Sequence, residues 1–186
     1  MKIIYKKLAD LSINLFKSKY VPFISEVEEF NEMMGKGDSN RDEPNIPSRN
    51  EWEFVYNFIL EELEEYRAAC EAGDIVEVAD ALGDIQYVLC NGILLHGFKT
   101  RFVDIYNEIQ SSNLSKICMT EEDAIETVKV RSKQQNEPCH FKQIGEGYVV
   151  YRTRDNKVMK NIKYFSPNLK QFFTQDELNK FNQKIK

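Results

Sequence analysis

Apolar and polar residues alternate with a helical period along most of the first 135 positions of the chain. Apolar residues that recur every three to four positions form one face of an amphipathic helix, so this pattern predicts a mainly helical protein. We expect helices over residues 2–18, 22–34, 50–71, 75–96, 100–111 and from about 120 to 135.

Glycine, proline and capping residues divide these segments. Pro22 lies in the first turn of the second helix, and residues 35–49 have the glycines and prolines of a loop. Gly73 is a typical residue for ending a helix, and Asp74 a typical N-cap for the next. Only these two residues separate the helices of residues 50–71 and 75–96, so we expect the two helices to pack antiparallel.

The pattern changes beyond Pro138. Residues 148–152 and 157–162 flank Asp155-Asn156, which is typical of a β-hairpin, and Thr174 begins a last short helix. A polar turn is expected at Ser111–Lys116. The sequence thus predicts an all-α helical bundle with a small β-hairpin-containing C-terminal appendage. The expected division is an N-terminal helical extension (1–21), a helical core (22–136) and a tail with the hairpin and short helix (137–186).

Composition narrows the class of protein. The 186 residues are 42% hydrophobic and 30% charged, and the net charge of −5 argues against a nucleic-acid or membrane partner, because both need a basic surface. The N-terminus lacks a signal-peptide pattern, and no run of about 18 apolar residues predicts a membrane span. The four cysteines show no C-x-x-C spacing, which favours reduced thiols in a cytoplasmic protein.

Two acidic clusters carry the candidate chemistry. At about 100° per residue, Glu62 and Glu65 fall within the apolar arc of the helix of residues 50–71, Glu61 lies at its border, and Glu64 points away. A buried charge is costly unless it is paired or bound to a metal. No basic residue shares these faces, so the pattern predicts a bound cation and assigns Glu64 to the surface.

The next helix has a second acidic stripe. Glu77, Asp80, Asp84 and Asn91 share one narrow stripe of a helix that is apolar around much of its circumference. Glu77 alone has a structural alternative, because it occupies the capping-box position after Asp74. An oxygen-only set of ligands on two facing helices suits Mg²⁺, with Mn²⁺ possible.

Several segments resemble one superfamily in their order along the chain. E-x-x-E (Glu62, Glu65) followed by E-x-x-D (Glu77, Asp80) resembles the signature of all-α nucleoside triphosphate pyrophosphohydrolases, which include MazG-like enzymes, dimeric dUTPases and phosphoribosyl-ATP pyrophosphohydrolase. Residues 78–88 resemble its V-A-D-A-L-A-D-L-L-Y-V segment, residues 106–116 its F-x-E-V-H-x-S-N-M-S-K segment, and residues 157–167 the tail that follows in that branch. The resemblance covers roughly residues 22–170.

The resemblance implies a fold and a reaction. It implies a helical bundle that assembles as a homodimer or homotetramer and hydrolyses a nucleoside triphosphate to the monophosphate and pyrophosphate, as in nucleotide-pool house-cleaning. By the same resemblance, Glu62, Glu65, Glu77 and Asp80 are expected to bind the metal, and Glu61 is expected to activate the attacking water.

Other candidate residues are expected to contact the substrate. They are Asp84, Tyr87, Asn91, Asn113, Ser115 and Lys116, of which Lys116 can neutralise phosphate. Asp84 is also an alternative to Asp80 as a metal ligand. Gln110 stands where the family often has histidine, and the arginine expected before the glutamates is absent, since Tyr56 and Asn57 lie there. These departures concern the triphosphate contacts and substrate preference, not the metal centre.

Three other classes of protein compete with this interpretation. A ferritin-like di-iron protein needs E-x-x-H pairs, and neither His96 nor His140 follows a glutamate at that spacing. A P-loop enzyme is excluded, because no G-x-x-x-x-G-K-[ST] occurs. A non-catalytic helical metal-binding or regulatory interaction protein remains the alternative. Within the enzyme class, the sequence leaves the preferred base open and makes a biosynthetic phosphoribosyl-ATP enzyme the less favoured choice.

Overall fold

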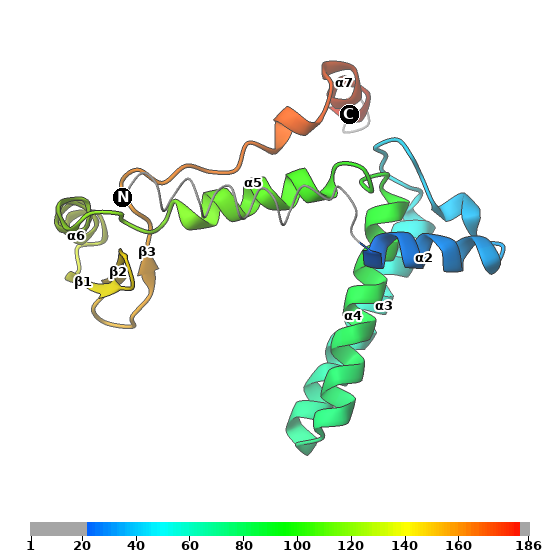
Figure 1. The fold of residues 1–186 in the computed structure, drawn as a ribbon, viewed down its shortest axis with the longest axis horizontal. Coiled ribbons are helices and arrows are strands. Elements are labelled where there is room, and N and C mark those ends of the chain that lie inside the picture. Colours follow the sequence, from blue (N-terminus) through cyan, green and yellow to red (C-terminus); the bar gives the residue numbers. More distant parts are fainter. Residues whose placement is uncertain (1–21, 183–186) are drawn as a thin grey trace. The chain divides into compact units, whose positions relative to one another are not determined.

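The structure is a computed structural model that describes residues 22–182. Its contacts divide the described residues into two compact units: unit 1 contains residues 22–103 and 173–182, and unit 2 contains Asp104–Phe172 (Figure 1). The predicted helix over residues 2–18 lies outside the described residues. The described fold is mainly helical with a small antiparallel sheet near the C-terminal end, which confirms the predicted fold class.

Unit 1 is built from helices. They are α2 (Pro22–Met33), α3 (Arg49–Ala72), α4 (Ile75–Leu95) and α7 (Gln175–Asn182), with a short 3₁₀ turn, η1 (Gly37–Ser39), before α3. Its core joins α2 to the C-terminal half of α4 through Ile24, Val27, Cys90, Ile93 and Leu94. Because residues 24, 27 and 31 of α2 share one helical face, α2 buries this face against α4.

Helices α3 and α4 form the predicted antiparallel hairpin (Figure 1). Glu51 accepts a hydrogen bond from the backbone N–H of Ser48 at 2.8 Å, which closes a capping box at the start of α3. Gly73 ends α3 with φ +70°, a left-handed conformation that glycine adopts without strain. Asp74 then accepts from the N–H groups of Val76 and Glu77 and begins α4.

The loop between α2 and α3 caps the C-terminal end of α4. The N–H groups of Arg41 and Asn45 donate to the carbonyls of Leu94 and His96, both at 3.1 Å. These bonds satisfy carbonyl groups that a helix leaves unpaired at its end. The loop runs so close to Gly97 that a Cβ at this position would lie 2.1 Å from the Glu43 carbonyl oxygen.

Helix α4 is long and apolar enough to cross a membrane by length and composition, and among the helices of residues 22–182 it alone is. This is weak evidence for a span, because the core helix of a soluble protein has the same properties. The carboxylates of Glu77, Asp80 and Asp84 along α4 would be expensive in hydrocarbon.

Unit 2 contains a helix packed on a three-stranded sheet. Most of α5 (Phe102–Leu114) belongs to it, together with α6 (Glu121–Gln135), β1 (Cys139–Ile144), β2 (Gly147–Arg152), β3 (Val158–Met159) and η2 (Leu169–Phe172). The strand order is β1-β2-β3, antiparallel throughout, and Val150 pairs with Phe141 on one side and Met159 on the other. Cys118, Ala124, Val150 and Met159 form the core.

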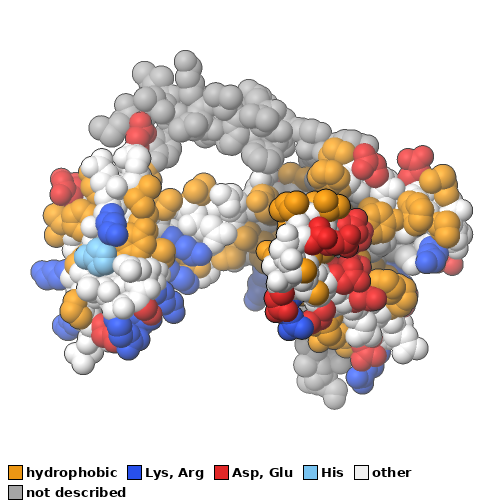
Figure 2. Space-filling view, turned by 90° about the horizontal axis from the view of Figure 1, so that it is seen from below, with side chains coloured by type: hydrophobic (Ala, Val, Ile, Leu, Met, Phe, Trp, Pro, Cys, Tyr) orange, Lys and Arg blue, Asp and Glu red, His pale blue; other side chains and the backbone are white. Residues whose placement is uncertain are grey.

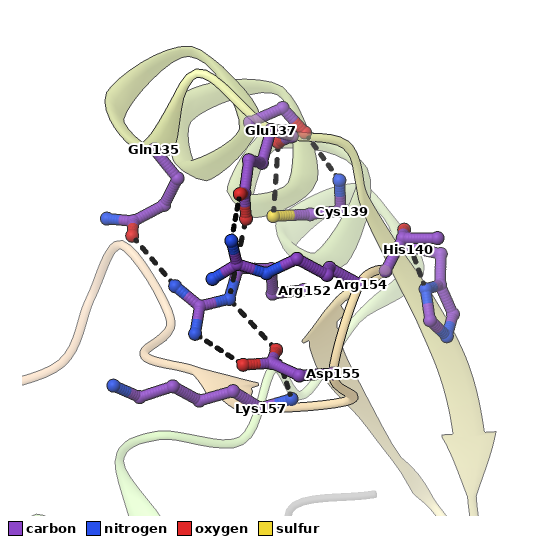
Figure 3. Close-up of polar contacts among 10 residues, drawn as sticks. Gln135, Glu137, Cys139, His140, Arg152, Arg154, Asp155 and Lys157 are labelled. Atoms are coloured by element: carbon purple, nitrogen blue, oxygen red, sulfur yellow. Dashed lines mark hydrogen bonds and ion pairs between the residues drawn. The ribbon is translucent and has the colours of Figure 1, made fainter.

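The predicted hairpin at Asp155-Asn156 is confirmed, and polar contacts hold its turn (Figure 3). Arg152 donates to both carboxylate oxygens of Asp155, at 2.9 and 2.6 Å, and the backbone N–H of Lys157 donates to the same group at 3.2 Å. Glu137 forms ion pairs with Arg152 and Arg154. The Arg152 guanidinium holds the pKa of Asp155 well below its usual range.

Two elements differ from the sequence prediction. Strand β1 was not predicted, because its residues Cys139–Ile144 mix polar and apolar side chains, although Pro138 and Gly145 frame them. The polar segment at Ser111–Lys116 is not a turn throughout, since α5 continues to Leu114. The buried Ser112 hydroxyl donates to the carbonyl of Phe165 at 2.8 Å, so tertiary packing of the tail satisfies a residue that otherwise favours turns.

The two units also differ from the expected division at residue 136. Helix α6 was assigned to the helical core, but it contacts β1 and β2 and shares their apolar core. Conversely, α7 from the expected tail belongs to unit 1, where Arg101 donates to both oxygens of Glu177 at 2.9 and 2.8 Å.

Candidate active site

The candidate site is a cavity of about 580 Å³ in unit 1, of a size that suits a small-molecule ligand. Its wall is formed by residues of three helices, α2, α3 and α4, and of the segment around η1. The lining residues are Phe30, Asn31, Lys36, Ser39, Asn50, Glu51, Phe54, Val55, Phe58, Glu62, Asp84, Tyr87, Val88, Asn91 and Leu95.

Glu62 on α3 and Asp84 on α4 bring negative charge to this cavity. One carboxylate oxygen of Glu62, Oε2, is shielded from solvent and has no hydrogen-bond partner. Burial raises the pKa of Glu62, and the charge of Asp84 raises it further. An unpaired acid is held here at an energetic cost, which is the situation that a bound cation relieves.

Three more of the predicted carboxylates lie within electrostatic reach of Glu62. After Asp84, the charges of Glu65, Glu61 and Asp80 also raise the pKa of Glu62. All three side chains are exposed in the single chain, although Glu65 was expected to be buried. The antiparallel hairpin therefore gathers acids from both predicted clusters, as the sequence indicated.

Glu77 is not among the carboxylates whose charge raises the pKa of Glu62. It lies in the first turn of α4, exposed, with its N–H bound by the Asp74 side chain. Asp84 lines the cavity, whereas Asp80 does not. The sequence left Asp84 open as either a metal ligand or a substrate contact. In the structure it is the acid of α4 that lines the cavity together with Glu62.

The donor chemistry fits a divalent cation, but the ligands are not gathered into one cluster. Within residues 22–182, no group of three or more His, Cys, Asp or Glu side chains is arranged so that it could hold a metal ion. The orphaned Oε2 of Glu62 and an all-oxygen donor set do suit Mg²⁺ or Mn²⁺. Exposed side chains such as Glu61, Glu65 and Asp80 have the freedom to turn toward such an ion.

The surface assignment of Glu64 is confirmed: this exposed side chain pairs with Arg67 one turn further along α3. The expected burial of the apolar arc of α3 is wrong for the single chain. Phe54 is 58% exposed and Trp52 38%, and Ala69 is the one buried residue of α3. The arc stays open because, among the described elements, α3 packs extensively against α4 alone.

Acidic and hydrophobic side chains lie next to one another on the right-hand part of Figure 2, where unit 1 is seen. Large apolar side chains of α4 are exposed as well, among them Ile75, Val76, Leu82 and Leu89. Apolar patches of this kind on a soluble protein mark surfaces that another molecule covers.

The predicted substrate residues divide between the two units. Tyr87 and Asn91 line the cavity with Asp84, and their contact with a substrate stays a prediction. Asn113, Ser115 and Lys116 belong to unit 2. There Lys116 donates to Asn113 at 2.7 Å, and the Ser115 hydroxyl donates to the carbonyl of Ser112 and accepts from the N–H of Phe165. These bonds give Ser115 a structural role in holding the tail.

Sequence reasoning missed the contribution of α2 and of the loop that follows it. Asn31 is 6% exposed and lines the cavity, and Lys36 brings a cation to it. Phe54 and Phe58 of α3 add an aromatic wall, with ring centroids 4.6 Å apart. The buried position of Asn31, on the same helical face as Ile24 and Val27, was the available signal.

The helical fold and the acid-lined cavity agree with the resemblance to the MazG-like nucleoside triphosphate pyrophosphohydrolase superfamily. Within it, residues 27–113 match the family model of phosphoribosyl-ATP pyrophosphohydrolase. This range begins in α2 and ends near the end of α5, so it contains every lining residue of the cavity. The match implies pyrophosphohydrolase activity on a nucleotide. No curated protein matches the chain.

Proposed function

We propose that the protein hydrolyses a nucleoside triphosphate between the α- and β-phosphates, in a reaction that depends on Mg²⁺ or Mn²⁺. The observation that carries this proposal is the orphaned Glu62 Oε2, placed with Asp84 in a cavity that suits a nucleotide. A triphosphate brings negative charge to an acidic site, so it needs cations between itself and the carboxylates.

The proposed ligands are Glu62 and the three carboxylates Asp84, Glu65 and Asp80, because the charge of each of the three acts on Glu62. A divalent cation held by these carboxylates would supply positive charge to the phosphate oxygens. Glu61, exposed beside this set, takes a proton from the attacking water as a general base. Lys36 on the cavity wall is suited to pairing with phosphate.

The proposed substrate is a nucleoside triphosphate, not phosphoribosyl-ATP. The support comes from unit 2. Its S-N-x-S-K segment and the tail resemble the branch of the superfamily other than the biosynthetic phosphoribosyl-ATP enzymes, and both segments belong to one small core. Asn161 ties them together: its N–H donates to the carbonyl of Lys116 and its side chain to that of Ile117. The proposed role is nucleotide-pool house-cleaning in the cytoplasm.

A homodimer, or a homotetramer built from it, is the proposed assembly. The exposed apolar residues of α3 and α4 support it, because a second copy that packs against this hairpin would bury them. Leu63→Glu should then shift the protein toward the monomer in sedimentation experiments. The matched change Ile144→Glu, at an exposed position of β1 in unit 2, should leave the assembly intact.

The decisive experiment measures pyrophosphate release from a panel of canonical and modified nucleoside triphosphates and from phosphoribosyl-ATP, with Mg²⁺, with Mn²⁺ and with chelator. We expect release with either cation and none with chelator. If no nucleotide yields pyrophosphate while Mg²⁺ still binds, the protein is instead the non-catalytic metal-binding alternative.

A further inference from the structure

Three asparagines on three different elements form a hydrogen-bonded chain at the wall of the cavity. Asn31 of α2 donates through Nδ2 to Oδ1 of Asn91 on α4, at 2.9 Å, and to Oδ1 of Asn40, at 3.1 Å. Asn31 is buried and, with Asn91, lines the cavity, whereas Asn40 does not.

The orientation of each amide in this chain follows from backbone carbonyl groups. Nδ2 of Asn40 donates to the Glu28 carbonyl at 3.1 Å, so its Oδ1 must be the atom that faces Asn31. Nδ2 of Asn91 donates to the Tyr87 carbonyl at 3.5 Å, so its Oδ1 also faces Asn31. A carbonyl oxygen can only accept, and it therefore excludes the flipped amide at both ends.

The fixed orientation determines what the chain offers to a ligand. Both Nδ2 protons of Asn31 are used, and none of the residues 22–182 donates to its Oδ1, which is left as an acceptor. Asn91 retains one Nδ2 proton as a donor. The more buried residue thus presents an acceptor and the less buried one a donor.

The position of these amides suits the base of a nucleotide. Asn91 follows Asp84 by seven residues on α4, about 10 Å along the helix axis. Phosphates near Glu62 and Asp84 would direct the base toward the asparagines. Phe30 and Tyr87, whose rings meet edge to face at 6.0 Å, and Phe54 supply apolar surface for stacking.

We propose that Asn31 and Asn91 select bases that carry an exocyclic amino group next to an unprotonated ring nitrogen, such as cytosine and adenine. The amino group donates to Oδ1 of Asn31, and the ring nitrogen accepts from Nδ2 of Asn91. A keto base places an oxygen against Oδ1 and an N–H against Nδ2, so both pairs are mismatched. This inference rests on the proposed function, because the phosphates set the direction of the base.

Two pairs of nucleotides that differ at this edge test the inference: CTP against UTP, and ATP against ITP. Dissociation constants are measured with Mg²⁺ for analogues in which a methylene group replaces the oxygen between the α- and β-phosphates, so that binding is read without turnover. We expect the amino member of each pair to bind at least about tenfold more tightly, since a mismatched buried polar group is costly.

Two variants separate amide orientation from cavity shape. Asn31→Leu keeps much of the volume and should reduce the preference to about twofold or less. Asn40→Ala leaves the cavity wall in place but removes one of the two acceptors that orient the Asn31 amide, so it should weaken the preference while kcat for CTP stays near wild type. Asn179→Leu, at an exposed site on α7, is the matched control and should keep the full preference.

The possible outcomes distinguish this inference from the proposed function. Equal binding within both pairs, tighter binding of UTP and ITP, or no binding of any analogue overturns the base selection. Pyrophosphate release that does not distinguish CTP from UTP also overturns it while the hydrolase assignment stands. Selective binding of CTP and ATP analogues without any pyrophosphate release supports the base site and removes the proposed reaction.

Discussion

Glu62 in unit 1 and Asp155 in unit 2 are carboxylates in opposite environments. In unit 1, Glu62 is partly buried with an oxygen that has no partner, and burial and four neighbouring acids raise its pKa. In unit 2, Asp155 receives both nitrogens of the Arg152 fork and a backbone N–H, and these bonds lower its pKa. Paired acids stabilise a fold, whereas unpaired acids store a cost that a ligand can relieve. We therefore expect Asp155 to be a structural acid and Glu62 a functional one.

The largest expected effect is on activity, from removal of the unpaired acid. Glu62→Gln should lower kcat/KM for pyrophosphate release by at least about a hundredfold, because it takes a ligand from the proposed cation. The melting temperature in chelator should stay the same or rise, since the substitution also removes charge repulsion. Asp155→Asn is the control in unit 2 and should retain activity. Full activity in Glu62→Gln would contradict the assignment of the site.

The second largest effect is expected on the free energy of unfolding when Mg²⁺ is added. If Mg²⁺ binds the folded state only, wild type should gain about 2.7 kcal/mol at a concentration 100 times the dissociation constant. Calorimetric melting with increasing Mg²⁺ measures this gain. It should persist in Asp155→Asn and be lost in Glu62→Gln. An equal gain in both variants would show that the cation binds elsewhere.

The contributions of Glu62 and Asp155 to the free energy of unfolding should change with pH in opposite directions. The pKa of Glu62 is raised from 4.5, so in chelator its stability contribution is fully present below 4.5 and is lost as the pH rises through the higher folded value. The pKa of Asp155 is lowered from 3.8, so its contribution is present above 3.8 and is lost as the pH falls below it.

Melting curves of the two variants across acidic pH measure these opposite responses. Glu62→Gln should lack the gain on acidification, and Asp155→Asn should lack the loss. If both variants kept the wild-type dependence of stability on pH, neither acid would contribute to stability in the way expected here.

The smallest effect is expected for Glu64, which belongs to the same acidic cluster of α3 as Glu62 but lies on the surface. Glu64 is exposed and paired with Arg67. Glu64→Gln should therefore change the free energy of unfolding by less than about 0.5 kcal/mol and leave activity unaltered. Denaturant titration and the pyrophosphate assay together check this. A large loss in either would mean that the helical face of α3 was assigned wrongly.

The sequence predicted elements whose signals are local. The turn at Gly73-Asp74, the start of α6 at Thr120 and the hairpin at Asp155-Asn156 all depend on neighbouring residues, and the structure contains each of them. Helical periodicity likewise separated Glu62 from Glu64. The boundary between the units depends on contacts distant in sequence, which periodicity does not report. Strand β1 was missed although it pairs with β2 through a turn at Gly145-Glu146, because its mixed side chains give a weak strand pattern.

The candidate site was predictable only in part for the same reason. The acids of α3 and α4 lie on adjacent helices, and short linkage alone predicts that they meet. Asn31 joins Asn91 from 60 positions away, and no spacing rule indicates such a pair. The expected burial of Glu65 and Phe54 was wrong for a different reason: a helical wheel shows which face is apolar, but not what covers that face.

If Asn31 and Asn91 select the base, a substitution at Gly97 would act on that selection from outside the site. The Glu43 carbonyl passes over this residue so closely that even one methyl group would force the loop to move. That loop carries Asn40, whose side chain holds the Asn31 amide in orientation. Laboratory evolution that screens for new nucleotide preferences should therefore recover substitutions at position 97, behind the cavity wall, as well as in the wall itself.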